Sequence, residues 1–243
     1  MNGPPTGNFE MKKSSGNTIA VVTGASEGIG LAVARLLSAG GVKVVLAARS
    51  EWKLKKAAGK LAGAVAIPAD LRKPGDREAL VRKTMERFGR IDILVNNAGQ
   101  GLYATFEKTE LKDFRSIMEL NVYAVTDLMQ KAIPIMRKQG RGRIINISSM
   151  VSKGCYPGLS AYASTKYALN ALSLIARKEL AKDGIVVSVM HPGATVTRFG
   201  LNAVGGESAY NRVIGKCLPR DTADDVAKKV MRLIESGEAE AGM

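Results

Sequence analysis

The feature that most constrains the fold is a regular alternation, along nearly the whole chain, of short apolar runs with longer helical patterns. The runs are continuous rather than alternating in polarity, as in IAVV at 19–22 and RIINI at 143–147. Continuous apolar character is typical of strands that are buried on both faces, as in parallel sheets. Six strands are predicted, over residues 18–23, 43–47, 64–68, 91–96, 143–148 and 185–190.

Helical patterns occupy the segments that follow these strands, over residues 28–39, 51–61, 76–88, 111–139, 160–182 and 222–235. Such an alternation requires right-handed crossovers, which place helices on both faces of one sheet. The predicted fold is therefore a doubly wound α/β domain with a parallel sheet of about six or seven strands. Pro134 predicts a kink or a break in the last third of the helix at 111–139.

The 243 residues suffice for one α/β domain. Polar residues 1–17 predict a flexible N-terminal tail, residues 18–243 a single domain, and the Gly- and Asn-rich residues 198–219 an irregular substrate loop. The apolar runs fall far short of the roughly 18 residues that span a bilayer, so no membrane segment is expected. Cys155 and Cys217 lack metal-ligand spacing, so a reduced, cytoplasmic protein without a metal site is expected.

The net charge is unusual, because 36 Lys and Arg residues outnumber 22 Asp and Glu residues to give +14. Such a balance fits a nucleic acid, an anionic membrane, an anionic small molecule or a solvated basic surface. The basic residues are spread along the chain and aromatic residues make up only 5% of it. Without a strip of interleaved basic and aromatic residues, no nucleic-acid partner is expected.

A glycine-rich segment, TGASEGIG at 23–30, joins the first predicted strand to the first helix. Glycines let the backbone turn sharply and approach a pyrophosphate, and the N–H groups at a helix start favour an anion. The spacing Gly-x-x-x-Gly-x-Gly differs from the common dinucleotide pattern G-x-G-x-x-G. The alternative is a tight turn that needs small residues only for packing.

Several motifs in register resemble the short-chain dehydrogenase/reductase family: TGASEGIG at 23–30, NNAG at 96–99, and Tyr162-x-x-x-Lys166 preceded by Ser149. Their order and separation match the family from Thr18 to about Glu235. The resemblance implies a Rossmann-type fold, a nicotinamide dinucleotide and hydride exchange between alcohols and carbonyl compounds.

The resemblance also implies which residues contact the cofactor. Asp70 and Leu71 look like the family's adenine-contacting pair, with a turn or helix-capping role for Asp70 as the alternative. The segment 192–197 resembles the stretch that contacts the nicotinamide carboxamide, and His191 before it is expected to be structural. The full predicted set is Gly24, Ser26, Glu27, Gly28, Ile29, Gly30, Arg49, Ser50, Asp70, Leu71, Asn97, Ala98, Gly99, Tyr162, Lys166, Pro192, Gly193, Thr195 and Thr197.

The end of the second predicted strand favours NADP(H) over NAD(H). In this fold the residue there faces the adenosine ribose, and an acid would accept hydrogen bonds from the 2′-hydroxyl. The chain has Ala48 at this position and Arg49 next to it, and a guanidinium suits a phosphate. Ser26 and Ser50 add donors, whereas Glu27 argues against a phosphate. The alternative is that Arg49 is a solvated surface residue.

Tyr162 and Lys166 are four residues apart in a predicted helix and therefore share one face. A phenol can give its proton to a carbonyl oxygen while hydride arrives at carbon, and a nearby ammonium lowers the phenol pKa. The resemblance selects Ser149 rather than Ser148 to polarise the substrate oxygen. It also gives Lys166 hydrogen bonds to the nicotinamide ribose, and Asn121 a water linked to Lys166.

The sequence thus predicts an NADPH-dependent carbonyl reductase acting on a small-molecule carbonyl or alcohol. The alternative is a catalytically silent protein that binds a dinucleotide as a sensor or scaffold. A mainly apolar pocket is expected from residues that are equally consistent with core packing: Leu102, Met150, Tyr156, Leu159, Phe199 and Leu201.

A homodimer is expected, because helices 111–139 and 160–182 resemble those that pair across a two-fold axis in the family. Many relatives also have a further strand near the end of the chain, which packs at a tetramer interface. Residues 237–243 contain no strand-like apolar run. A seventh strand and a tetramer contact are therefore doubtful expectations for this chain.

Overall fold

The computed structural model describes residues 17–206 and 221–243. Almost all of the predicted tail at 1–17, the later part of the predicted loop at 198–219, and Cys217 lie outside the described residues. None of the helices in the described ranges combines the length and the apolar character that crossing a membrane requires.

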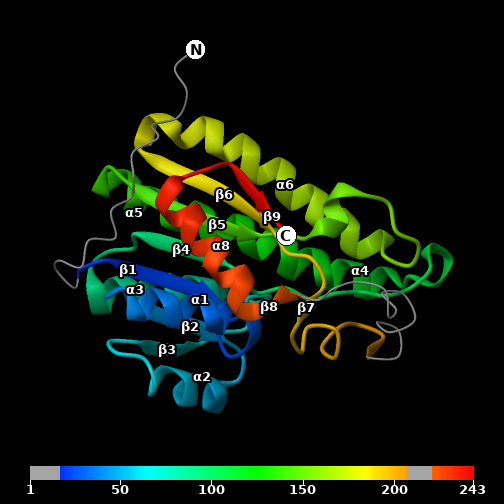
Figure 1. The fold of residues 1–243 in the computed structure, drawn as a ribbon, viewed down its shortest axis with the longest axis horizontal. Coiled ribbons are helices and arrows are strands. Elements are labelled where there is room, and N and C mark those ends of the chain that lie inside the picture. The colour runs from blue at the N-terminus through cyan, green and yellow to red at the C-terminus, as the bar shows by residue number, and fades with distance from the viewer. Residues whose placement is uncertain (1–16, 207–220) are drawn as a thin grey trace.

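A seven-stranded parallel sheet forms the centre of the molecule, in the order β3-β2-β1-β4-β5-β6-β9 (Figure 1). The fold is therefore the predicted Rossmann-like, doubly wound α/β type, with the chain reversing its direction across the sheet between β1 and β4. The strands are β1 (Ile19–Thr23), β2 (Lys43–Ala48), β3 (Val65–Pro68), β4 (Ile93–Asn96), β5 (Gly142–Ile147), β6 (Ile185–His191) and β9 (Glu240–Gly242).

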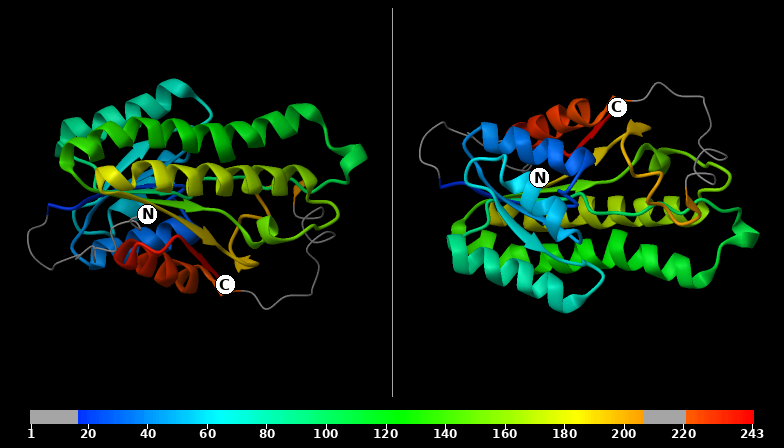
Figure 2. Two further views of the ribbon diagram at one scale, coloured as in Figure 1. Left: turned by 90° about the horizontal axis from the view of Figure 1, so that it is seen from above. Right: turned by 90° about the horizontal axis from the view of Figure 1, so that it is seen from below.

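Helices cover both faces of the sheet, α1, α2 and α8 on one side and α3, α5 and α6 on the other (Figure 2). The unbroken apolar runs have a simple cause in this arrangement. In β1, Ala20 and Val22 pack in the core under α1 and α8, whereas Val21 packs in the opposite core. The helices are α1 (Gly28–Ala39), α2 (Glu51–Ala58), α3 (Pro74–Phe88), α4 (Leu111–Met118), α5 (Ala124–Gln139), α6 (Ser160–Leu180) and α8 (Ala223–Ser236).

The predicted helix at 111–139 is interrupted, but not at Pro134. A π-helical turn, Glu119–Tyr123, separates α4 from α5, and α5 continues through Pro134. Both Pro134 and Gln130, whose carbonyl the proline ring leaves without its helical donor, lie on the exposed side of α5. Water can therefore replace the lost hydrogen bond, and the predicted break at Pro134 is wrong.

The expectation against a seventh strand is also wrong. Residues Glu240–Gly242 form β9, which pairs in parallel with β6 from Val189 to His191. A strand at the edge of a sheet is joined by backbone hydrogen bonds, which do not depend on apolar side chains. Here the Glu240 side chain adds a hydrogen bond of 2.8 Å to His191 on the neighbouring strand.

Candidate active site

The candidate site lies at the edge of the sheet where the parallel strands have their carboxyl ends. Ligands of doubly wound sheets bind at this edge, where the strand order reverses. In this chain the reversal lies between β1 and β4, so the segments that follow Thr23 and Asn96 flank the crevice. Residues from β5 and β6 continue the same edge on one side.

The glycine-rich segment forms a close turn between β1 and α1. Gly24 and Gly28 have φ angles of 63° and 59°, a left-handed conformation that favours glycine. A Cβ on Gly30 would lie 2.5 Å from the carbonyl oxygen of Gly24, so only glycine lets the helix approach the turn. The Glu27 side chain does not cap α1, which leaves the first helical N–H groups to an anion.

Asn97, which the sequence predicts to contact the cofactor, holds this turn in place. Its amide Nδ2 donates to the carbonyl oxygens of Thr23 (2.9 Å) and Gly24 (3.2 Å). The backbone N–H groups of Asn97 and Ala98 donate in turn to the Thr23 hydroxyl, at 2.9 and 3.0 Å. Thr23 is a residue that the sequence analysis missed, although it is the first letter of TGASEGIG.

The predicted adenosine side consists of the loops after β2 and β3. Arg49 is exposed, and Ser50 does not use its hydroxyl to cap α2. Asp70 accepts a hydrogen bond of 3.2 Å from the Arg72 backbone N–H, which fits its alternative role in the turn. Leu71 is buried in the core. Burial, and in second place the charge of Arg49, lowers the pKa of Arg72, which places the two guanidinium groups near each other.

Glu27, which argued against a phosphate, has its charge balanced in the structure. The Lys53 ammonium of α2 donates to Glu27 Oε2 at 2.9 Å. The Asn202 amide donates to Glu27 Oε1 at 3.2 Å and so joins the predicted substrate loop to the glycine-rich turn. Neither partner of Glu27 was anticipated from the sequence.

Tyr162 and Lys166 lie one above the other on α6, and both are buried. The Lys166 ammonium lies 5.8 Å from the centre of the Tyr162 ring and donates to the carbonyl oxygen of Ile147 at 2.9 Å. The Ser149 hydroxyl lies close enough to the Tyr162 hydroxyl to act on its pKa. The structure therefore brings the three groups predicted for catalysis together at the ends of β5 and α6.

Burial acts on the two titratable groups in opposite directions. It raises the pKa of Tyr162 above the usual value of a phenol, and the nearby Ser149 hydroxyl opposes this only in part. Burial also lowers the pKa of Lys166 to about 8. The sequence analysis expected the Lys166 ammonium to lower the pKa of Tyr162, but in the protein alone the pKa of Tyr162 is raised. Here Tyr162 is held as a protonated phenol, which is a proton donor.

Asn121 lies in the π-helical turn and is fully buried. Its Oδ1 accepts from the Gln100 N–H at 2.9 Å, and its Nδ2 donates to the Gln100 carbonyl (2.9 Å) and the Thr165 hydroxyl (3.1 Å). The amide therefore ties the segment after β4 to α6. A Cβ on Gly99 would lie 3.2 Å from Asn121 Oδ1 and 3.7 Å from Lys166 Nζ, so glycine keeps this corner open.

The segment at 192–197 lies across the crevice from the glycine-rich turn. A Cβ on Gly28 would lie 3.3 Å from the Thr197 methyl group. The Thr195 hydroxyl donates to the Gly193 carbonyl at 3.1 Å, and the Pro192 carbonyl accepts from the Met150 N–H at 2.9 Å. The predicted nicotinamide segment and the predicted phosphate turn are therefore neighbours in space.

Apolar and aromatic side chains pack around Tyr162. The Phe199 ring lies 5.8 Å from the Tyr162 ring at an angle of 50°. The same cluster contains Leu159, as predicted for the pocket, and three residues the sequence analysis missed: Tyr103, Val151 and Ala203. Of the other predicted pocket residues, Leu102 packs in a separate cluster with Ile117, and Tyr156 and Leu201 are exposed.

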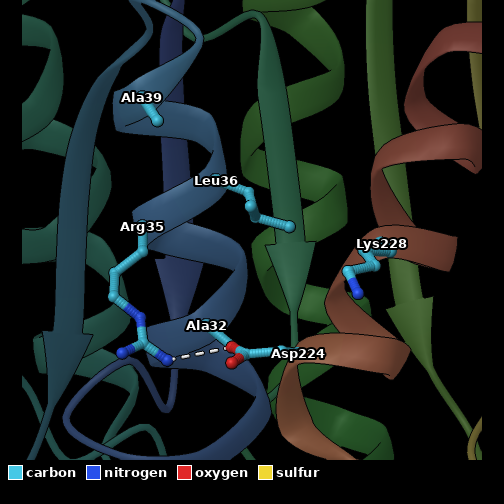
Figure 3. Close-up of a pocket in the computed structure, with 6 residues that line it drawn as sticks. All are labelled: Ala32, Arg35, Leu36, Ala39, Asp224 and Lys228. Atoms are coloured by element: carbon cyan, nitrogen blue, oxygen red, sulfur yellow. Dashed lines mark hydrogen bonds and ion pairs between the residues drawn. The ribbon is translucent and has the colours of Figure 1, made fainter.

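A hollow with a volume of about 390 Å³ lies between α1 and α8 (Figure 3). An exposed ion pair of 3.0 Å between Arg35 and Asp224 closes one end of it. Its lining residues are Ala32, Arg35, Leu36, Ala39, Asp224 and Lys228. It contains none of the residues predicted for catalysis or cofactor binding, so it is a surface groove between helices.

Comparison with known proteins agrees with this architecture. A profile of the family described as short chain dehydrogenase matches residues 18–204. An uncharacterized oxidoreductase of Staphylococcus aureus (strain MRSA252) is 34% identical over 211 residues, which cover 86% of this chain and 88% of that protein.

Two solved structures are similar over nearly the whole chain. A short-chain dehydrogenase from Sphingobium yanoikuyae in complex with NADPH is 28% identical with a TM-score of 0.83, over 93% of this chain and 87% of that one. A 3-ketoacyl-(acyl-carrier-protein) reductase from Brucella melitensis complexed with NADH is 28% identical with a TM-score of 0.82, over 93% and 96%. With its matching profile, sheet order and relatives, the chain belongs to the short-chain dehydrogenase family and is an oxidoreductase with a dinucleotide-binding fold.

Proposed function

We propose that this protein is an NADP(H)-dependent carbonyl reductase that transfers hydride between the nicotinamide and a carbonyl or alcohol substrate. The observation that carries the proposal is the convergence of the Tyr162 and Ser149 side chains beside the buried ammonium of Lys166. Two hydroxyl groups that meet at one point can share one substrate oxygen. A buried cation next to them can stabilise the negative charge that a proton transfer leaves behind.

The residues at the crevice fit a dinucleotide. Only glycine fits at position 30 in the turn, and the uncapped start of α1 offers N–H groups to a pyrophosphate. In this proposal the turn at 24–30 holds the phosphates, the loops at 49–50 and 70–71 hold the adenosine, and the segments at 97–99 and 192–197 hold the nicotinamide end. When bound, the nicotinamide supplies or accepts the hydride.

In the reducing direction, the Tyr162 hydroxyl gives its proton to the carbonyl oxygen of the substrate. The Ser149 hydroxyl donates a hydrogen bond to the same oxygen and polarises the carbonyl group. The phenolate that forms is stabilised by the Lys166 ammonium and is reprotonated from solvent. Both amide hydrogens of Asn121 are donated to protein groups. A relay water at Asn121 therefore has to bind the second lone pair of Asn121 Oδ1 or a backbone carbonyl of the π-helical turn.

The preference for NADP(H) rests on the charges near the adenosine loop. The position at the end of β2 is Ala48 and not an acid, Arg49 next to it is exposed, and Arg72 lies near Arg49. The Glu27 carboxylate is balanced by Lys53, which removes most of its repulsion toward a 2′-phosphate. The substrate side is apolar and aromatic around Tyr162, which fits a hydrophobic carbonyl compound. The proposal includes a cytoplasmic, homodimeric enzyme.

The decisive experiment measures NADPH oxidation with a panel of aliphatic, alicyclic and aromatic ketones, together with NADPH binding. Tyr162→Phe is expected to lower kcat by about 10²–10⁴-fold, because it removes the proton donor, and to leave the Kd for NADPH within about twofold. Tyr123→Phe, at an exposed tyrosine outside the predicted pocket, is the matched control and keeps full activity. NADPH binding without turnover of any ketone by the unaltered protein would instead support the silent sensor.

Cofactor preference is tested in the same assay. Arg49→Ser is expected to raise the KM for NADPH by about tenfold or more, because it removes a charge-assisted hydrogen bond worth about 1.5–3 kcal/mol. The KM for NADH is expected to stay within about twofold, since NADH has no 2′-phosphate. Lys55→Ser, which removes an exposed charge from α2, is the control. Equal effects of Arg49→Ser on both cofactors would contradict the NADP(H) preference.

A further inference from the structure

The single histidine of the chain lies in a chain of side-chain contacts that reaches the loop of Ser149. His191 is the last residue of β6 and is buried. Its Nε2 lies 2.8 Å from Glu240 Oε1 on β9, and its Nδ1 lies 3.4 Å from the Ser152 hydroxyl. Ser152 donates to the carbonyl oxygen of Ser149 at 2.6 Å.

The order of serine, histidine and glutamate is that of a hydrolytic triad, but the geometry excludes a nucleophilic role. Ser152 is only 3% exposed, so no substrate reaches it. Its hydroxyl hydrogen is directed at Ser149, and it accepts a hydrogen bond of 2.9 Å from Asn170 Nδ2. The group is therefore a support for the loop and not a second reaction centre.

The direction of each hydrogen bond follows from the chemistry of its partners. A carboxylate only accepts, so Glu240 fixes a hydrogen on His191 Nε2. The ring then presents its Nδ1 lone pair to Ser152 Oγ at 3.4 Å. Because the single Ser152 hydrogen goes to the Ser149 carbonyl, this is a packing contact, which limits where the Ser152 oxygen can lie. The same hydroxyl holds the Ser149 carbonyl, and the Ser149 side chain in turn accepts from the Val151 N–H at 3.3 Å.

Charged groups around the histidine keep Glu240 in its accepting form. The Lys153 ammonium donates to Glu240 Oε1 at 2.8 Å. The Lys153 hydrogen bond, with that of His191, lowers the pKa of Glu240, and burial opposes this. From the other side, the Met243 N–H donates to the His191 carbonyl at 3.3 Å. The short strand β9 is thus attached to the catalytic loop through side chains as well as through the sheet.

We propose that Glu240, His191 and Ser152 are positioning residues that orient Ser149 toward the substrate oxygen. Through them β9, the strand that the sequence analysis did not expect, acts on the reaction. This inference rests on the proposed carbonyl reduction for its effect on kcat. The orientation of the loop itself can be measured without turnover.

The test uses two substitutions of His191, each of which keeps one of its two side-chain contacts and removes the other. An Asn side chain places its amide near the Nδ1 position and a Gln side chain near the Nε2 position. His191→Asn therefore keeps a contact with Ser152, whereas His191→Gln keeps the contact with Glu240 and loses Ser152. We expect kcat to fall by roughly tenfold in His191→Gln and in Ser152→Ala, and clearly less in His191→Asn, with the KM for NADPH unchanged in all three.

Glu238→Gln removes an exposed carboxylate close to β9 and is the matched control. Equal losses of kcat in His191→Asn and His191→Gln, or a fall in Tm without any loss of kcat, would show that His191 only packs the core and would overturn the proposal.

Hydrogen exchange gives a readout that is independent of activity. The Met150 and Val151 amides, which donate to Pro192 and Ser149, are expected to exchange faster in His191→Gln than in Glu238→Gln. If the unaltered protein reduces no carbonyl, the proposed function fails while the exchange experiment still decides the positioning role. Unchanged exchange at both amides would overturn it.

Discussion

At the scale of single residues, burial changes the pKa values of the two titratable groups in the candidate site. The Tyr162 phenol is kept protonated by burial, and the Lys166 ammonium is destabilised by the same burial, to a pKa of about 8. A buried amine costs folding free energy while it is charged. The proposed mechanism gives this costly group a use, because an ammonium beside Tyr162 stabilises the phenolate that proton transfer forms.

The cost predicts how stability changes with pH. The pKa of Lys166 is about 8 in the folded chain and 10.5 in the unfolded one. Between these values the unfolded chain binds more protons, so stability rises with pH, by up to about 1.4 kcal/mol per pH unit. Urea unfolding at pH 7.5 and at pH 10 gives the free energy of unfolding of the unaltered protein and of Lys166→Met. The difference in this free energy between the two proteins is expected to change between the two pH values. A difference that stays constant would show that Lys166 is not buried while charged.

Amide side chains are the second residue-scale feature. Asn97 and Asn121 were predicted from the family resemblance to serve the cofactor and the proton relay. In the structure both amides are used to join backbone segments, Asn97 at the glycine-rich turn and Asn121 between Gln100 and Thr165. The sequence shows that an amide is present, but its hydrogen-bond partners come from elements that are distant in the chain.

At the scale of elements, the glycine-rich turn shows how closely a strand, a turn and a helix are fitted together. The helix α1 approaches the turn so closely that a Cβ on Gly30 would meet both the Gly24 carbonyl and the Asn97 amide at 2.5 Å. Backbone atoms cannot move aside as a flexible side chain does. The N-terminus of α1 can therefore lie against the turn only because residue 30 has no Cβ.

Substitution of this glycine is expected to separate binding from general stability. Gly30→Ala must shift α1 away from the turn, so NADPH affinity is expected to fall by about tenfold or more, with a lower Tm. Gly75→Ala in α3 is the matched control, because nothing lies within 4 Å of its Cβ position. The control is expected to keep its affinity and to gain roughly 0.4–1 kcal/mol of stability. Titration of NADPH fluorescence and thermal unfolding measure both effects; an unchanged affinity in Gly30→Ala would contradict the phosphate-binding role of the turn.

At the scale of the whole molecule, apolar side chains remain exposed on one face of α6. Tyr167, Leu172 and Ile175 are 44%, 41% and 56% exposed. Ile175 lies three residues after Leu172 and about two turns after Tyr167, so the three lie on one side of the helix. Tyr123, 55% exposed, is the last residue of the π-helical turn, which packs against α6. Contiguous apolar surface of this kind is a feature of protein interfaces.

The expected homodimer can be tested on this face. Ile175→Arg places a charge on the exposed face of α6 and is expected to convert the dimer to a monomer, since an unpaired charge in an interface costs several kcal/mol. Trp52→Arg alters a residue on α2 that is 65% exposed, and it is the control. Analytical ultracentrifugation measures both variants. A dimer that persists in Ile175→Arg would place the interface elsewhere, and a monomeric unaltered protein would contradict the prediction of a dimer.

The fold class was predictable because it depends on local patterns. Continuous apolar strands, intervening amphipathic helices and a glycine-rich turn each leave a mark in a short stretch of sequence, and together they allow few topologies. The six long strands and their helices appear as predicted, with ends that differ by a few residues. The π-helical turn at Asn121 was missed, because an added residue in a helical turn hardly changes the apolar pattern.

The sequence by itself determined the layered fold, the glycine-rich turn and the pairing of Tyr162 with Lys166, since each depends on residues that are close along the chain. Only the tertiary structure decided that Glu240 joins the sheet, that Lys53 balances Glu27, and that His191 connects β9 to the loop of Ser149. These contacts join residues far apart in sequence, and their free energies depend on distance and burial, which no local pattern encodes.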